Sequence, residues 1–157
     1  MSMTVYTGGS CVYPGTLEAN AGIGVFLGPG YKRNFSGRLP GKCQTSNRAE
    51  FGAIKRALLI LSSQSMLPQT DGEPVFIMTR SKYAIGCVTI WLKKWARNGW
   101  LDARGRPVAN KDLIVDIITL VLLCPYKVLF VHSPAIAADK SSVRAKELAA
   151  KAARNCR

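Results

Sequence analysis

The alternation of hydrophobic and polar positions predicts a protein built from both strands and helices. Short runs rich in β-branched and aromatic residues are typical of strands, and five such runs lie at residues 3–7, 21–27, 31–39, 75–78 and 128–131. Short turns join the first three runs, which are therefore expected to form an antiparallel meander. The last two runs are almost wholly apolar, a pattern typical of buried parallel strands.

Apolar residues recur at helical spacing between residues 46 and 61, where Phe51, Ile54 and Leu58 fall on one face of a predicted helix. Ser46 is a candidate for the N-cap of this helix. Further helices are predicted at residues 81–85, 88–97, 111–123 and 141–153. The resulting order, βββαβαααβα, predicts an α/β fold. Its mixed five-stranded sheet has three antiparallel strands followed by two parallel strands and is flanked by helices.

Composition and charge indicate a class of partner. The 157 residues include 22 Lys and Arg but only 9 Asp and Glu, which gives a formal net charge of +13. Such an excess favours a polyanionic partner, nucleic acid before an anionic membrane surface, and a basic surface kept for solubility is the plain alternative. No repeat or linker divides the sequence, so we expect one domain over residues 1–157.

Cysteine usage and hydropathy argue against several other classes. The five cysteines are spread along the chain without a C-x-x-C pair, which argues against a disulfide framework or a zinc site and suits a reducing compartment. No N-terminal signal pattern is visible, and the longest apolar stretch, residues 113–124, is interrupted by Asp116 and too short for a bilayer. We therefore expect a soluble, intracellular monomer that binds no membrane and no cofactor.

Several motifs, in order along the chain, carry a resemblance to a known family. They are Val5-Tyr-Thr-Gly-Gly-Ser-Cys11, Gln44-Thr-Ser-Asn-Arg-Ala-Glu50, Thr79-Arg-Ser-Lys-Tyr83, Trp91-Leu-Lys-Lys-Trp-Ala-Arg-Asn-Gly-Trp100, Val131-His-Ser-Pro134 and Ala145-Lys-Glu-Leu-Ala149. Together they resemble type 1 ribonuclease H, whose motifs read Y-T-D-G-S, Q-T-N-N-R-A-E, T-D-S-K-Y, a basic protrusion, V-H-V-P-G-H and A-D-x-L-A. The resemblance covers nearly the whole chain and implies the ribonuclease H-like fold.

The resemblance also implies a two-metal catalytic centre, for which four positions of this chain are decisive. The family holds two Mg²⁺ ions with four clustered carboxylates. Those positions are Gly8, Glu50, Arg80 and Lys146 here, and the family's mobile histidine falls on Ile136. Only Glu50 is a carboxylate, and a net positive ligand set repels Mg²⁺. We therefore predict a catalytically inactive relative, a pseudo-ribonuclease H that is not an enzyme and holds no metal.

The same substitutions suggest a role for the two cations. Arg80 and Lys146 are hypothesised to occupy the place of the metals and to bind the scissile phosphate, Arg through its planar fork and Lys as a point charge. The alternative is that both simply pair with Glu50 in a relaxed pocket.

The positions of the family's substrate groove are better preserved than those of its metal centre. A minor-groove reader, a phosphate pocket, an aromatic channel for the DNA sugar and a basic protrusion are all implied. The minor-groove reader corresponds to Gln44, Ser46 and Asn47, and the phosphate pocket to Thr45 and Asn110. The aromatic channel corresponds to Tyr83, Trp91 and Trp95. The basic protrusion carries Lys93, Lys94, Arg97, Arg104 and Arg106. Cys43 stands where some relatives have the third, arginine, member of the phosphate pocket. At least one tryptophan is expected to anchor its helix to the core instead.

We therefore predict a protein that binds RNA/DNA hybrid or double-stranded RNA without cleaving it. The alternative function is a protein–protein interaction module or a ribonucleoprotein subunit, which would dock through an apolar patch around Ile136. An enzyme of different chemistry has little support, because the chain has one histidine and no plausible Cys–His pair.

Overall fold

The computed structural model describes residues 3–63, 72–134 and 139–155. Within these ranges the elements are, in chain order, β1 (Met3–Val12), β2 (Asn20–Phe26), β3 (Phe35–Arg38), α1 (Ser46–Ser62), β4 (Val75–Thr79), α2 (Lys82–Thr89), α3 (Leu92–Asn98), α4 (Lys111–Leu123), β5 (Val128–His132) and α5 (Lys140–Asn155). This succession confirms the predicted order βββαβαααβα. No helix of the described ranges is long and apolar enough to cross a bilayer.

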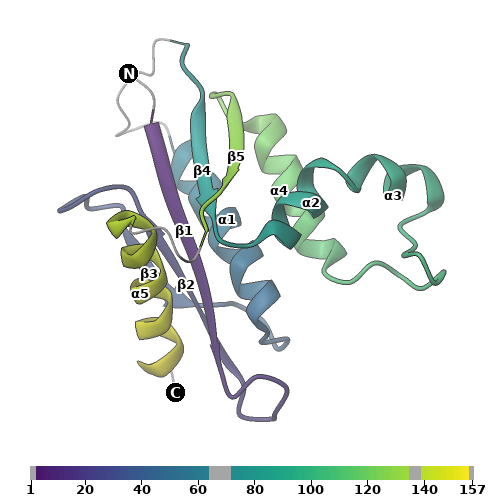
Figure 1. The fold of residues 1–157 in the computed structure, drawn as a ribbon, viewed down its shortest axis with the longest axis horizontal. Helices are drawn as coiled ribbons and strands as arrows, with labels where there is room; N and C mark the ends of the chain where they lie inside the picture. The colour runs from purple at the N-terminus through teal and green to yellow at the C-terminus, as the bar shows by residue number, and fades with distance from the viewer. Residues whose placement is uncertain (1–2, 64–71, 135–138, 156–157) are drawn as a thin grey trace.

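The strands form one mixed sheet in the order β3-β2-β1-β4-β5. β1 pairs antiparallel with β2, and β2 with β3, whereas β4 runs parallel to β1 and β5 parallel to β4. The predicted arrangement of three antiparallel strands followed by two parallel strands is therefore confirmed. Figure 1 shows the strands side by side, with α3 and the chain that follows it extending away from the sheet.

Adjacent residues of β1 show that α1 and α5 cover opposite faces of the sheet. Successive side chains of a strand point to opposite sides. A Cβ on Gly9 would meet the α1 backbone at Glu50, whereas a Cβ on Gly8 would meet the α5 backbone at Ala145. The sheet is therefore the middle layer between two layers of helices.

Helix α1 supplies a large part of the hydrophobic core. Phe51, Ile54 and Leu58 have no exposed area and pack in one cluster with Val5 of β1 and Ile77 of β4. The face predicted from their spacing is the face that is buried. Burial of each such side chain stabilises the fold by about 1.5–3 kcal/mol.

Helix α5 lies directly on the sheet, with no large side chain between them. Ala145 and Ala149 of the helix are fully buried and face Gly24 of β2. A Cβ on Gly24 would stand 2.2 Å from the Ala145 carbonyl oxygen, far inside van der Waals contact. The glycine therefore permits a close approach of helix to sheet, and this approach brings Lys146 against β1.

The first and third strands differ in length from those predicted, because pairing with β2 decides where they end. β1 continues from residue 7 to Val12, since its second half pairs with β2. The third strand is shorter than residues 31–39: a turn precedes it, closed by a hydrogen bond from the Asn34 N–H to the Tyr31 carbonyl.

The two helices predicted at residues 81–85 and 88–97 are divided at a different point. The N–H groups of Ile90 and Trp91 both donate to the Gly86 carbonyl, at 3.0 and 2.9 Å, and this contact ends α2. The break therefore comes several residues later than predicted, because it depends on a shared carbonyl acceptor rather than on hydrophobic spacing.

Candidate nucleic-acid interface

Glu50 on α1 lies in a small charged cluster with Arg80, which directly follows β4, and Lys146 on α5. Burial raises the pKa of the Glu50 carboxyl above its usual range, while Lys146, the Gly9 backbone and Arg80 act in the opposite direction. Glu50 Oε2 and Arg80 Nε are both buried without a hydrogen-bond partner. The charged cluster therefore has more positive than negative charge, and some of its polar atoms are unused.

Lys146 is held by the backbone of β1. Its Nζ donates a hydrogen bond to the Gly9 carbonyl. The ion pairs found among the described residues include neither Lys146 nor Arg80 nor Glu50. The two cations thus lie near the carboxylate and offset part of the rise that burial causes in its pKa, but neither is joined to it in a closed ion pair.

Gly8 has no room for a side chain. A Cβ there would stand 2.9 Å from the carbonyl carbon and oxygen of Ala145 and 2.9 Å from the backbone nitrogen of Lys146. The α5 backbone therefore occupies the space that a side chain at this position would need. An aspartate could be accepted only if α5 moved away from β1.

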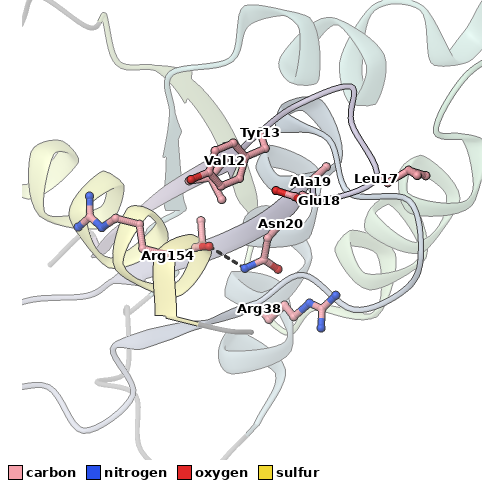
Figure 2. A pocket seen from close by; sticks show the side chains of 9 residues that line it. Val12, Tyr13, Leu17, Glu18, Ala19, Asn20, Arg38 and Arg154 are labelled. Carbon is pink, nitrogen blue, oxygen red and sulfur yellow. Dashed lines mark hydrogen bonds between the residues drawn. The ribbon is translucent and has the colours of Figure 1, made fainter.

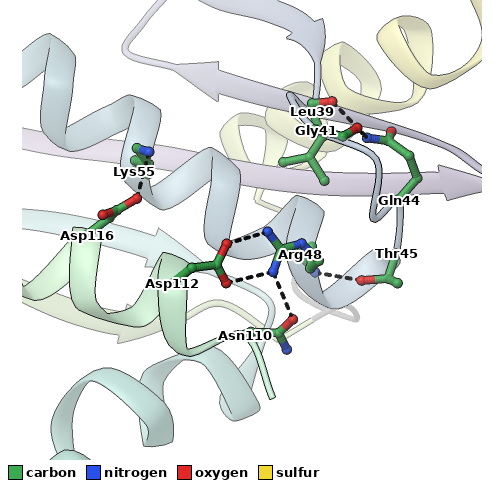
Figure 3. A network of polar contacts seen from close by, with 9 residues as sticks. All are labelled: Leu39, Gly41, Gln44, Thr45, Arg48, Lys55, Asn110, Asp112 and Asp116. Carbon is green, nitrogen blue, oxygen red and sulfur yellow. Dashed lines mark hydrogen bonds and ion pairs between the residues drawn. The ribbon is translucent and has the colours of Figure 1, made fainter. Parts of the chain in front are cut away.

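Gln44 is used inside the fold, although the motif suggested that it reads a duplex. It is 8% exposed, and its Oε1 accepts a hydrogen bond from the Ala21 N–H at 2.8 Å. Its Nε2 donates to the carbonyls of Leu39 and Gly41, at 2.9 and 2.8 Å, as Figure 3 shows. Both amide hydrogens are thus engaged, and Gln44 ties the loop before α1 to β2. The other two residues predicted to read the duplex, Ser46 and Asn47, are exposed.

Thr45 and Asn110, predicted to share a phosphate pocket, are brought together by Arg48 (Figure 3). Thr45, and not Ser46, is the N-cap of α1: its Oγ1 accepts from the Arg48 N–H at 3.1 Å. The Arg48 guanidinium makes two bonds to Asp112, at 2.9 and 2.7 Å, and a longer one of 3.4 Å to Asn110 Oδ1. Arg48 was not singled out in the sequence, because its partner is 64 residues away and no local pattern marks the pair.

Four aromatic side chains form a continuous row in which the second ring, that of Trp91, is the exposed one. Ring centroids are 6.2 Å apart between Tyr83 and Trp91, 6.1 Å between Trp91 and Trp95, and 5.9 Å between Trp95 and Trp100. Tyr83, Trp95 and Trp100 pack against the hydrophobic core, whereas Trp91 is 39% exposed. This aromatic row offers at least one ring face to a ligand and anchors the rest.

The basic residues of the protrusion lie on α3, which also carries Trp95, and in the loop that follows it. Lys93, Lys94, Arg97 and Arg104 are exposed, and none belongs to an ion pair among the described residues. Arg106 differs, because its Nε lies 3.2 Å from Asp102 Oδ2. Lys111, which the sequence did not single out, lies with its Nζ 5.4 Å from the centre of the Trp100 ring.

A family model described as RNase H matches residues 1–154. The chain belongs to the RNase H family. Ribonuclease H1 of Mus musculus is 36% identical over 116 residues, which are 74% of this chain and 38% of that protein. Ribonuclease H of Schizosaccharomyces pombe is 41% identical over 110 residues, 70% of this chain and again 38% of that protein. The chain therefore spans less than half the length of these relatives.

Solved structures agree on the RNase H fold. The foamy viral protease-reverse transcriptase in complex with RNA/DNA hybrid superposes with a TM-score of 0.76, at 23% identity, over 97% of this chain and 20% of that one. At this level of identity the likeness establishes the fold alone.

The relatives contradict the prediction that this chain is not an enzyme. Proteins 36% and 41% identical to it are named ribonuclease H1 and ribonuclease H, so the RNase H family that it joins is one of enzymes. That prediction is therefore wrong. The prediction of inactivity used only the identity of four side chains. Those four positions describe one arrangement of metal ligands, and their identity alone does not establish that the family's reaction is lost.

The two Mg²⁺ ions that the RNase H family implies do not fit the donor set of the charged cluster. Hard divalent ions need several oxygen ligands, but Glu50 is accompanied here by two cations. Among the described residues, no group of three or more His, Cys, Asp or Glu side chains could hold a metal ion. Ile136, the predicted counterpart of the mobile histidine, lies outside the described residues.

Proposed function

We propose that this RNase H-family chain binds RNA/DNA hybrid. The observation that carries the proposal is the aromatic row, which reaches the surface at Trp91 and whose Trp95 shares α3 with exposed basic side chains that belong to no ion pair among the described residues. Lys93, Lys94 and Arg97 supply charges that attract phosphates, and bases or sugars can lie on an indole face. Neither feature alone would favour nucleic acid over other anions or apolar ligands, but their combination does.

Polar groups at the start of α1 support a hybrid as the ligand. Ser46 and Asn47 are exposed in the first turn, where they can donate to 2′-hydroxyls and base edges in a wide, shallow minor groove. Thr45 and Asn110, both bonded to Arg48, supply a hydroxyl and an amide for the phosphate of the other strand. The foamy viral neighbour, whose structure is a complex with RNA/DNA hybrid, has the same fold.

Fluorescence anisotropy tests the proposal directly. Labelled RNA/DNA hybrid, double-stranded RNA and double-stranded DNA of one sequence are titrated over a series of salt concentrations, and every probe is run on a denaturing gel so that strand cleavage is scored separately from binding. We expect the hybrid to bind most tightly. Weak binding of about 10⁻⁴–10⁻⁶ M, equal for all probes, would instead be the generic attraction of a basic surface and would refute the proposal.

A pair of matched variants locates the interface. Lys93→Gln with Lys94→Gln removes two charges beside the aromatic row, and we expect hybrid affinity to fall and the salt slope to decrease by about 2. Lys127→Gln with Lys151→Gln removes two exposed charges elsewhere and serves as the control. Equal effects in both double variants would mean that binding does not depend on this surface.

The alternative of a protein-docking module gains no support from the described residues. The apolar patch predicted for it is centred on Ile136, which lies outside them.

A further inference from the structure

The charged cluster has positive charge that no carboxylate of the described residues neutralises in an ion pair. Lys146 is fixed by its bond to the Gly9 carbonyl, and Arg80 Nε is buried without a partner. Neither cation forms an ion pair with Glu50 within the described part of the chain. An unpaired arginine and lysine beside one buried carboxylate are suited to an additional anion.

The position of the cluster indicates which anion that is. Arg80 is separated from Tyr83, the inner end of the aromatic row, by only two residues. Glu50 lies three and four residues after Asn47 and Ser46, so these three side chains share one side of α1. The cluster therefore lies between the polar first turn of α1 and the aromatic row, which are the two parts of the proposed hybrid interface.

The close contact of α5 with β1 fixes the surroundings of both Gly8 and Lys146. Because the α5 backbone fills the space beside Gly8, a carboxylate cannot stand there without displacing the helix. The same contact carries Lys146 to the Gly9 carbonyl. The packing of α5 on β1 thus both excludes a side chain at residue 8 and anchors a cation next to it.

We propose that Arg80 and Lys146 form a metal-independent phosphate site, which receives a backbone phosphate of the bound RNA/DNA hybrid. This inference rests on the proposed function, because the phosphate reaches the site only as part of a duplex that also contacts α1 and the aromatic row. The two side chains supply the positive charge that a divalent ion would otherwise bring to the phosphate. Hybrid binding by the native chain is then independent of Mg²⁺.

Anisotropy titration of the hybrid in Mg²⁺ and in EDTA, at matched ionic strength, tests the metal independence. We expect equal affinity in both buffers. Affinity that is lost in EDTA would overturn the inference, because the cations would then not suffice. If the native chain shows no preference for hybrid in either buffer, the proposed function fails and the inference fails with it.

The double variant Arg80→Gln/Lys146→Gln tests the site itself. We expect hybrid affinity to fall about tenfold and the salt slope to decrease by about 1, the value for one lost phosphate contact. Lys127→Gln/Lys151→Gln removes the same charge away from the interface and should change affinity far less. If both double variants bind alike while the native chain still prefers hybrid, the phosphate site is refuted and the proposed function stands.

Removal of both cations leaves the Glu50 carboxylate buried without compensation, which opposes folding of the double variant. The triple variant Glu50→Gln/Arg80→Gln/Lys146→Gln replaces all three charged groups by neutral amides. Circular dichroism and thermal unfolding show which variant is folded, and the same affinity comparison is then made with that protein.

Discussion

Truncation of Gln44 to alanine tests whether this side chain holds the fold or contacts nucleic acid. Its amide makes three hydrogen bonds, of 2.8, 2.9 and 2.8 Å, to Ala21, Leu39 and Gly41. The bonds to Ala21 and Leu39 are buried, and the third is partly buried. Removal of the amide takes its hydrogen bonds away from two buried backbone groups, the Ala21 N–H and the Leu39 carbonyl.

The expected magnitude follows from these three bonds. An unpaired buried backbone group costs about 1–3 kcal/mol. Water can reach the Gly41 carbonyl more readily, so the two buried groups account for most of the effect, and we expect Gln44→Ala to lower the free energy of unfolding by about 2–4 kcal/mol. For a chain of this size the melting temperature should fall by about 5–15 °C.

Urea unfolding followed by circular dichroism measures the loss, with Asn47→Ala as the control, since Asn47 is exposed in the same motif. Below its melting temperature, Gln44→Ala should bind hybrid as the native chain does, whereas Asn47→Ala should bind it more weakly. A Gln44→Ala protein of native stability with reduced hybrid affinity would refute the reasoning and restore Gln44 as a reader of the duplex.

Three further predictions follow from the same structure. Gly8→Ala should lower the free energy of unfolding by about 1–3 kcal/mol through overpacking against α5; Ser10→Ala in the same strand is the control, and native stability of Gly8→Ala would contradict the close contact. The Arg48 guanidinium lowers the pKa of Asp112 from 3.8 to about 2. Because this pKa is depressed in the folded state, the ion pair stabilises the protein above pH about 4, and this stabilisation is lost as the pH falls towards 2. The Asp112 side chain is 62% exposed, so solvent screening limits the contribution of the pair to about 1 kcal/mol. The stability of Asp112→Asn should therefore fall less than that of the native chain as the pH is lowered from 4 to 2. Identical dependence of stability on pH in the two proteins would argue against the pair. Trp91→Leu should weaken hybrid binding by about 1–3 kcal/mol with little loss of stability, and unchanged affinity would remove Trp91 from the interface.

Local patterns were sufficient for the elements and for their order. The helical spacing of Phe51, Ile54 and Leu58 identified the buried face of α1, because a side chain on every third or fourth position necessarily lies on one side of a helix. Lys111–Leu123 was recovered with its predicted bounds for the same reason. Motif order along the chain identified the fold and the family.

Boundaries and caps were less predictable, because they depend on partners elsewhere in the chain. Residues 8–12 joined β1 only because β2 offers a ladder of hydrogen bonds. The N-cap of α1 is Thr45 rather than Ser46. Both residues have a hydroxyl side chain that can cap a helix, so the sequence does not distinguish them.

The sequence by itself determined the element types, the basic charge and the identity of the residues at the four positions of the family's metal centre. Only the tertiary structure decided what those residues do. Lys146 meets the Gly9 carbonyl across 137 positions of sequence, and Arg48 meets Asp112 across 64. Gln44, typical of a binding motif, became a structural residue because its amide faces β2. Periodicity records the surroundings of one segment, whereas hydrogen bonds and charge contacts of this kind exist only after distant segments have packed together.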